Sequence, residues 1–213
     1  MYTQRPMIRT DRAFSEAVTR AVAGAERGTG AELIVVVAAR SGTYLDVALL
    51  AGAAVAVVNL LIALFAPTIF PPAVVAVEVP FEFALAAWLA HRTPALLRAL
   101  TPSARRRRQV ERAAAAHFVG EAVHGTRGRT GLLVYLSLLE EEVALIPDLG
   151  LTGKIPSVLW SGVSWAATGD RRRPRSSSDF AGGIEQIGAI LRTRLPSADT
   201  DGNESPDAPR FVS

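Results

Sequence analysis

Carboxylates are the side chains best able to do chemistry in this chain, because it has no cysteine and only three histidines. Asp148 follows a predicted strand, and loops at strand ends are where α/β folds usually carry their sites. Asp11 and Asp46 are the other carboxylates that we expect to take part. Together the three could hold a hard cation, which prefers several oxygen ligands. The alternative is that Asp148 accepts backbone N–H groups within its own turn, as Asp commonly does.

The sequence does not support a catalytic or metal site built on cysteine, histidine or serine. The absence of cysteine excludes disulfides, thiolate chemistry and Cys-based zinc sites. His117 and His124 share a helix face but are seven residues apart, whereas two ligands on one helix need a spacing of three or four. Ser137, Ser161 and Ser164 lack a surrounding nucleophile elbow, which argues against a serine hydrolase.

Arginine supplies nearly all of the positive charge, since the chain has a single lysine, Lys154. The residues that we expect to contact an anion, a lipid head group or a partner are Arg105, Arg106, Arg107, Arg108, Arg127 and Arg129. The last two lie in Gly125–Gly131, whose glycines could let backbone amides hold an anion. This segment lacks the Walker pattern and precedes a strand rather than a helix. Because no aromatic side chains are interleaved with the arginines, we expect no nucleic-acid partner.

A long apolar segment divides the chain. Val47–Ala66 is 20 residues long and consists of Ala, Val, Leu, Ile, Gly and Phe, interrupted only by Asn59. A helix of this length spans roughly 30 Å, the thickness of a bilayer core. Three prolines in residues 67–72 must then turn the chain. A second apolar run, Ala73–Ala90, carries Trp88 near its end, where interfacial aromatics concentrate. The pattern predicts a transmembrane hairpin within 44–92, with helices at about 45–66 and 72–90.

Two alternatives to this hairpin are considered, and the second is rejected because the strands before and after the insertion must pair on one side of the membrane. One is a buried helix pair in a soluble core, and the other is one span followed by an interfacial helix. Arginines flank the hairpin at Arg40 and from Arg92 onward, and the turn has no charge. The positive-inside rule therefore predicts an integral membrane protein with both termini in the cytoplasm, in the inner membrane if the protein is bacterial.

Polar side chains within the predicted spans are unexpected. Glu78 and Glu82 are one turn apart, and they lie roughly 12 and 18 Å deep when counted from Phe70. Asn59 lies at a depth similar to that of Glu78. A carboxylate in hydrocarbon is costly, so it should be protonated or face a partner. We expect an Asn59–Glu78 hydrogen bond between the helices and Glu82 at an oligomer interface; the alternative is a proton or cation path in an oligomer.

The segments on either side of the hairpin predict one split α/β domain. Residues 1–43 contain a helix that starts at Asp11 and a strand at Glu32–Ala38. Residues 93–196 contain an Arg-rich helix, strands at Gly131–Leu138 and Glu142–Pro147, a helix at Ser157–Thr168 and a helix at Phe180–Leu195 capped by Asp179. Neither half has a sheet that is stable alone, so the first two strands should be neighbours. Residues 197–213 are acidic and predicted to be disordered.

The order of these segments resembles the membrane-inserted bacterial branch of the TPM domain family. The matching stretches are GAELIVVVAARS, the hydrophobic hairpin with the Arg-rich helix, HGTRGRTGLLVYLSLLEEEVALIPDLGL and AGGIEQIGAILRTRLP. The resemblance implies a small β-sheet sandwiched by helices and, as in some soluble relatives, calcium-dependent phosphatase activity at an acidic cleft. Those relatives carry a Gly-x-Gly-x-Glu stretch and an Asp after the third strand, and in this chain Gly150 remains but Lys154 stands near where an acid is expected. Here that glutamate is absent, which favours a role without catalysis.

Two main functions follow for this chain. The first is a membrane-anchored, non-enzymatic accessory protein whose cytoplasmic domain binds an unidentified protein, a second copy of itself or the membrane surface. The second is a metal-dependent phosphatase of the TPM type, which would require Asp11, Asp46 and Asp148 to converge. An oligomeric conduit built around Glu78 and Glu82 is a third.

Overall fold

The computed structural model describes residues 8, 10–66, 70–160, 162–163, 165, 173–174, 176–197 and 206–212. The chain divides into two compact units, and each is described by itself. The first consists of Met1–Ser41 and Arg107–Ser213, and the second of Gly42–Arg106. The inserted unit contains the apolar hairpin predicted from the sequence.

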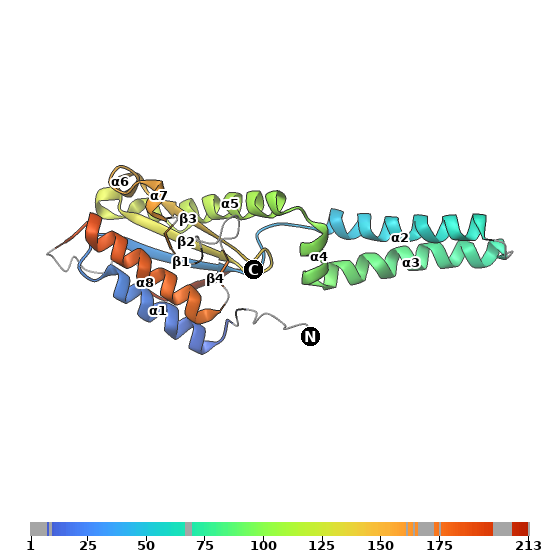
Figure 1. The fold of residues 1–213 in the computed structure, drawn as a ribbon, viewed down its shortest axis with the longest axis horizontal. Helices are drawn as coiled ribbons and strands as arrows, with labels where there is room; N and C mark the ends of the chain where they lie inside the picture. The colour runs from blue at the N-terminus through green and yellow to red at the C-terminus, as the bar shows by residue number, and fades with distance from the viewer. Residues whose placement is uncertain are drawn as a thin grey trace. The chain divides into compact units, whose positions relative to one another are not determined.

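A four-stranded sheet organises the first unit (Figure 1). Its strands are β1 (Glu32–Ala38), β2 (Gly131–Ser137), β3 (Glu142–Pro147) and β4 (Arg210–Val212), in the order β3-β2-β1-β4. β1 runs parallel to β2 and to β4, whereas β2 and β3 form an antiparallel hairpin. The predicted pairing of the first two strands across the insertion is therefore confirmed, and the architecture is mixed α/β.

Both faces of β1 and β2 are buried. The helices of this unit that pack on them are α1 (Arg12–Glu26), α5 (Ser103–Gly120) and α8 (Ser177–Arg194). Leu33, Val35 and Val37 belong to one core cluster with residues of α1 and α8. Ile34 and Val36 belong to a second cluster with residues of α5. Burial on both faces explains why these strands are continuous apolar runs rather than alternating ones.

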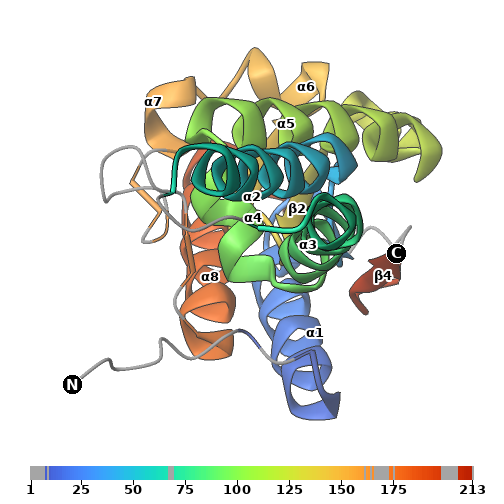
Figure 2. The same cartoon turned by 90° about the vertical axis from the view of Figure 1, so that its right-hand side faces the viewer.

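Helices α1 and α8 lie side by side on one face, and both views of the chain show it (Figures 1 and 2). A Cβ added to Gly188 would lie 2.5 Å from the Cα of Ala25, so the two backbones approach as closely as glycine allows. The rings of Phe14 and Phe180 stack with their centroids 5.9 Å apart. The predicted start of α1 is confirmed, because the Asp11 side chain accepts the Phe14 N–H at 3.0 Å.

Two predictions about the end of the chain are wrong. Ser176, not Asp179, caps α8, because its hydroxyl accepts the Asp179 N–H. Within the tail predicted to be disordered, Arg210–Val212 form β4, which joins β1 at Val36–Ala38, while residues 198–205 and 213 lie outside the described part of the chain. Charge and proline content indicated disorder, but the free edge of β1 offers backbone hydrogen-bonding groups to any short segment that can reach it.

Short helices also depart from expectation. The structure has α4 (Pro94–Leu100), α6 (Leu149–Thr152) and α7 (Ser157–Trp160). The predicted helix Ser157–Thr168 ends as α7 at Trp160, and several residues after that lie outside the described part of the chain. Helices this short leave almost no periodic signal in a sequence.

The second unit is an antiparallel helix pair, α2 (Leu45–Phe65) and α3 (Pro72–Arg92), seen end-on in Figure 2. Both are long and apolar enough to cross a membrane. Only 22% and 11% of their most apolar windows are buried within the chain, whereas the core helix of a soluble protein would be mostly buried. Gly52 sets their contact, since an added Cβ there would lie 2.6 Å from the Phe83 carbonyl oxygen.

A carboxyl group joins the end of α1 to the start of β1. Glu26 accepts the Leu33 N–H through Oε1 at 2.7 Å. The pKa of Glu26 is raised to about 8. Burial of the carboxyl group is the largest cause, and the negative charges of the nearby Glu32 and Asp207 also raise the pKa. The C-terminal end of a helix disfavours negative charge further. The folded protein therefore holds Glu26 protonated at pH values where the unfolded chain releases the proton.

We predict that the stability of the first unit falls as pH rises from about 4.5 to 8, the two pKa values of Glu26 in the unfolded and folded states. Glu26→Gln keeps an acceptor for Leu33 and removes the titration. Urea unfolding of the full chain in detergent, followed by near-UV circular dichroism, should show the variant more stable by about 1–2 kcal/mol at pH 8.5, a value reduced for solvent screening. The difference should vanish at pH 4.5 and below. A constant difference across this range would contradict the assignment.

Candidate functional site

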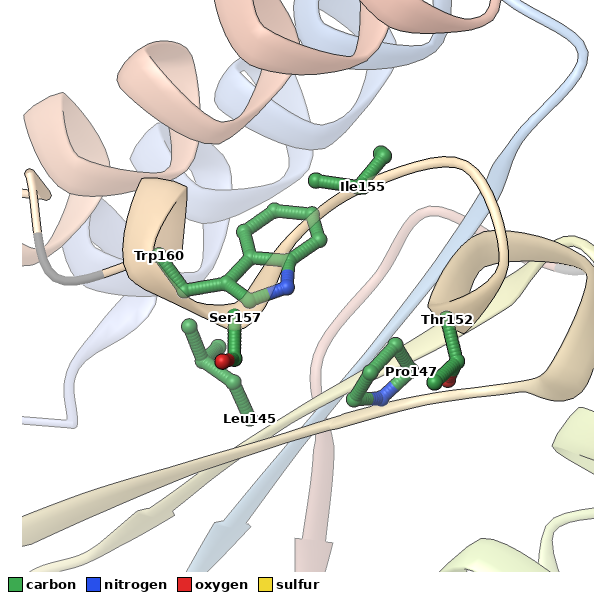
Figure 3. A pocket seen from close by; sticks show the side chains of 6 residues that line it. All are labelled: Leu145, Pro147, Thr152, Ile155, Ser157 and Trp160. Atoms are coloured by element: carbon green, nitrogen blue, oxygen red, sulfur yellow. The ribbon is translucent and has the colours of Figure 1, made fainter.

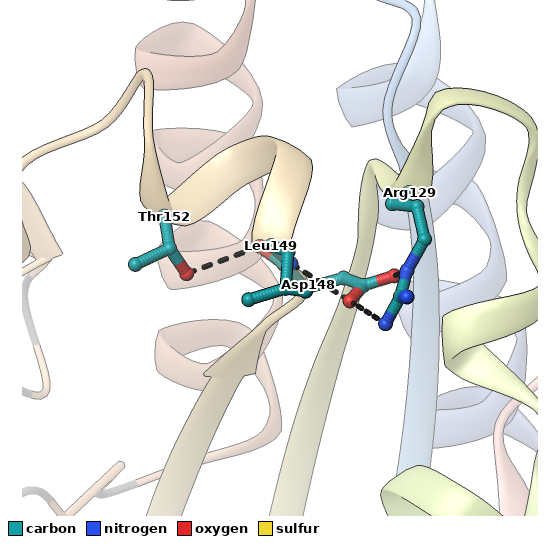
Figure 4. A network of polar contacts seen from close by, with 4 residues as sticks. All are labelled: Arg129, Asp148, Leu149 and Thr152. Atoms are coloured by element: carbon teal, nitrogen blue, oxygen red, sulfur yellow. Dashed lines mark hydrogen bonds and ion pairs between the residues drawn. The ribbon is translucent and has the colours of Figure 1, made fainter.

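A buried carboxylate and an arginine form a polar corner where β3 ends (Figure 4). The side chain of Asp148 is 2% exposed, and Arg129 holds it through two hydrogen bonds of 2.9 and 3.0 Å. Oδ1 also accepts the N–H of Leu149 at 2.7 Å, and the Asp148 carbonyl accepts the Thr152 hydroxyl. The arginine hydrogen bonds are the main cause that lowers the pKa of Asp148 below its ordinary value. Asp148 is therefore ionised. Its carboxylate oxygens accept hydrogen bonds from the next residue, Leu149, and from Arg129 in the loop before β2.

The loop that carries Arg129 has an unusual backbone. It contains two 3-10 turns, Val123–Gly125 and Arg127–Arg129. Gly128 and Arg129 have φ of +73° and +57°, in the left-handed region. Gly150 packs against this loop, and an added Cβ would lie 2.3 Å from the Gly128 carbonyl oxygen. The close approach is what allows the Arg129 side chain to reach Asp148.

A groove of about 350 Å³ opens beside this corner (Figure 3). It is lined by Leu145, Pro147, Thr152, Ile155, Ser157 and Trp160, so its walls come from β3, α6, α7 and the segment that joins the two helices. Leu149 on α6 and Val158 on α7 are large apolar side chains left 69% and 70% exposed. The groove thus combines apolar side chains with the hydroxyl groups of Thr152 and Ser157.

The three carboxylates predicted to bind calcium do not fit such a site. Asp11 caps α1, and both oxygens of Asp148 are bound to Arg129. Asp46 belongs to the other unit, where Arg105 binds both of its oxygens at 2.7 and 2.9 Å. Among the described residues no three His, Asp or Glu side chains gather as a metal site would require. Calcium takes six to eight oxygen ligands, and these side chains already serve other partners.

The arginines predicted to contact an anion, a lipid head group or a partner differ in what they bind in the structure. Arg105 binds Asp46, and Arg106 is 8% exposed and donates to the carbonyl oxygens of Arg98 and Thr101. Arg107 pairs with Glu111 at the surface, at 2.9 Å. Arg108 is exposed, and the side chain of Arg127 lies outside the described part. Arg105, Arg106 and Arg129 thus hold the structure together, which leaves Arg107 and Arg108 as the described candidates for contact with anionic lipid.

A polar network that the sequence did not predict lies at the opposite end of β2. Glu140 is fully buried and accepts the N–H of Ser41 at 3.0 and 3.1 Å. The Ser137 hydroxyl donates to the same carboxylate, and the Ser41 hydroxyl bonds the Tyr135 hydroxyl at 3.1 Å. Burial raises the pKa of Tyr135, which keeps the phenol neutral. The only sequence signal was Ser137 three residues before Glu140 in a tight turn, a spacing that is common in turns without function.

The hydrogen bonds of this network connect two segments of the first unit. Glu140 ties residue 41, the last residue of the first unit before the insertion, to the β2–β3 hairpin. His117 stacks on the Tyr135 ring at 5.5 Å and its Nδ1 lies 3.7 Å from Glu121, so neither contact aims it at Ser137. Within the described residues, no Ser–His–acid arrangement forms here.

The polar residues of the hairpin do not meet as predicted. Asn59 and Glu82 are half-buried, and Glu78 is exposed. Among the described residues, no hydrogen bond joins Asn59 to Glu78. The expected pairing between the helices is therefore absent, because Gly52 fixes the rotation of α3 with Phe83 and Ala87 facing α2.

We predict that Gly150→Ala destabilises the protein by about 1–3 kcal/mol, because its Cβ would displace the backbone of Gly128 and Arg129. Gly153→Ala is the matched control: there the nearest atom to an added Cβ is 3.7 Å away, and the change should stay within about 0.5 kcal/mol of the original. Urea unfolding of the full chain in detergent measures both. Equal stability of the two variants would show that the loop is not held by this contact.

Comparison with known proteins shows a fold and no family. No protein-family model matches the chain, and no curated protein matches it. Among solved structures, the chain is similar to the BA42 protein from the psychrophilic bacterium Bizionia argentinensis, determined by NMR. The identity is 12%, the TM-score is 0.54, and the match covers 100% of both chains. At this identity the likeness supports the fold alone.

Proposed function

We propose that this chain is a membrane-anchored interaction protein, with an α/β domain displayed on the cytoplasmic side and no catalytic activity of its own. The observation that carries the proposal is the exposed apolar hairpin. Two 21-residue helices keep most of their apolar surface outside the chain, and a bilayer is the solvent that such a surface suits.

The connection of the hairpin supports two spans rather than one. β1 precedes the hairpin and β2 follows it, and the two strands pair along their whole length. Both ends of the insertion must therefore lie on the same side of the membrane. The arginines flank this side and the turn is uncharged, which supports a cytoplasmic domain. Trp88 is 54% exposed near the end of α3, with Arg92 over its ring, an arrangement that suits an interface.

The groove supports binding of a partner rather than catalysis. Its lining is mainly apolar, and the exposed Leu149 and Val158 lie on the two helices that border it. Asp148 and Arg129, at the corner beside the groove, neutralise each other. We also propose that the chain is related to the TPM domain family, because its sequence segments follow the same order.

Membrane topology tests the anchor. The chain has no cysteine, so single cysteines can be introduced at Phe70 beside the turn and at the exposed Glu16 and Lys154 of the domain. In intact cells, an impermeant maleimide should label Phe70→Cys only. Glu16→Cys and Lys154→Cys should react after permeabilisation, and all three proteins should resist carbonate extraction. Labelling of Glu16→Cys and Lys154→Cys on opposite sides would indicate one span, and extraction by carbonate would contradict the anchor.

Photo-crosslinking tests the binding role. A photoreactive residue in place of Val158, at the groove, should give a discrete adduct in cells that make the protein naturally. The matched control in place of Glu16, which is exposed on α1, should give none. Absence of a discrete adduct at Val158 would contradict the role of the groove.

An enzyme assay tests the absence of catalysis. Calcium-dependent hydrolysis of a chromogenic phosphate ester by the purified protein would contradict the non-enzymatic assignment.

A further inference from the structure

One face of α3 carries both acidic side chains of the hairpin. Its members, here called the glutamate stripe, are Val74, Glu78, Phe81, Glu82 and Leu85. At about 100° per residue they fall within one narrow sector of the helix. Val74, Phe81 and Leu85 are 49%, 64% and 42% exposed, Glu78 is exposed and Glu82 is half-buried. Glu78 and the three apolar side chains of the stripe therefore lie on the outer surface of the hairpin, and Glu82 lies at the partly covered edge of the stripe.

The contact between α2 and α3 keeps the stripe outside. Phe83 and Ala87 face Gly52, where an added Cβ would lie 2.6 Å from the Phe83 carbonyl oxygen and 3.0 Å from the Ala87 Cβ. The mean direction of Phe83 and Ala87 is roughly 175° around the helix from the centre of the stripe. Rotation of α3 that brought Glu78 inward would separate the two closely packed backbones. The Glu78 carboxyl must then find a partner outside its own hairpin, and the half-buried Glu82 lies one turn away on the same side of α3.

Depth makes such a partner necessary if the hairpin spans a bilayer, as the proposed function holds. Counted from Pro72, the first residue of α3, Glu78 and Glu82 lie roughly 9 and 15 Å along the helix. In a hydrocarbon core about 30 Å thick, the second is near the midplane. An unpaired carboxyl there is costly even when protonated, because its O–H and C=O groups lose the hydrogen bonds of water.

We propose that the glutamate stripe is the interface of a homodimer, with a second copy of α3 packed on it in the membrane. From Val47 to Ala90 the chain has no Lys, Arg or Asp, so at this depth a second copy offers carboxyls as its only ionisable side chains. Two protonated carboxyls can each donate one hydrogen bond to the other, which satisfies both without charge. A two-fold axis along the membrane normal places Glu78 and Glu82 opposite their equivalents, with the apolar side chains of the stripe packed around them.

The test is energy transfer between labelled copies of the full chain in liposomes, measured over a series of protein-to-lipid ratios. Lys154→Cys, in the exposed part of the domain, carries the fluorophore. The wild type should dimerise. Glu78→Leu with Glu82→Leu should weaken dimerisation by about tenfold or more, since leucine can neither donate nor accept the hydrogen bonds that join the two helices. Glu78→Gln with Glu82→Gln should keep the dimer, because the amides still donate and accept.

The matched control is Val77→Leu with Ala84→Leu, two exposed positions of α3 outside the stripe and outside the contact with α2. It should leave dimerisation unchanged. A monomeric wild type at every ratio, an unaffected leucine variant, or loss of the dimer in the glutamine variant would each overturn the proposal. Flotation of the same liposomes separates this failure from failure of the proposed function. A protein that floats but stays monomeric keeps the anchor and loses the interface, whereas a protein that does not float loses both.

Discussion

The parallel pairing of β1 with β2 is the interaction on which the other parts of this protein depend. The two strands are separated in the chain by the whole hairpin unit, yet they pair in register from Glu32 with Gly131 to Ala38 with Ser137. A parallel pair always needs a long connection, which is usually a single crossover helix. Here the connection includes the inserted unit, and α5 follows it to cover one face of the sheet. The same pairing requires the insertion to leave the domain and return to it on one side.

Buried carboxylates mark both ends of this strand pair. At one end Asp148 is bound by Arg129, and at the other Glu140 is bound by the Ser41 N–H and the Ser137 hydroxyl. A buried charge is tolerated only when such partners replace water. The two carboxylates therefore hold loops in place: the one at Asp148 shapes the groove beside α6, and the one at Glu140 secures the chain where the insertion begins. Neither has free oxygen atoms to offer a metal in the way that the three predicted aspartates were expected to.

The hairpin differs from the first unit, because most of the apolar surface of its two helices is not buried within the chain. Its helices touch through a small residue, Gly52, which brings the backbones close, as in many membrane helix pairs. That contact decides which side chains face outward, and it leaves Glu78 among them. The proposed dimer is the consequence of one constraint: a hairpin of two helices has too few neighbours to satisfy polar groups on its outer surface.

The sequence alone determined the apolar hairpin, the strands β1 to β3 and the start of α1, because these depend on local patterns of hydrophobicity and on a single capping side chain. It indicated that β1 and β2 are neighbours, since neither is stable without the other. Only the tertiary structure decided what Asp11, Asp46 and Asp148 bind, because a carboxylate has the same sequence signature whether it meets a metal, an arginine or a backbone N–H. Only the tertiary structure showed β4, the Glu140 network and the outward direction of Glu78. Each depends on contacts between residues far apart in the chain, and the spacing of residue types along the chain does not record which distant groups will meet.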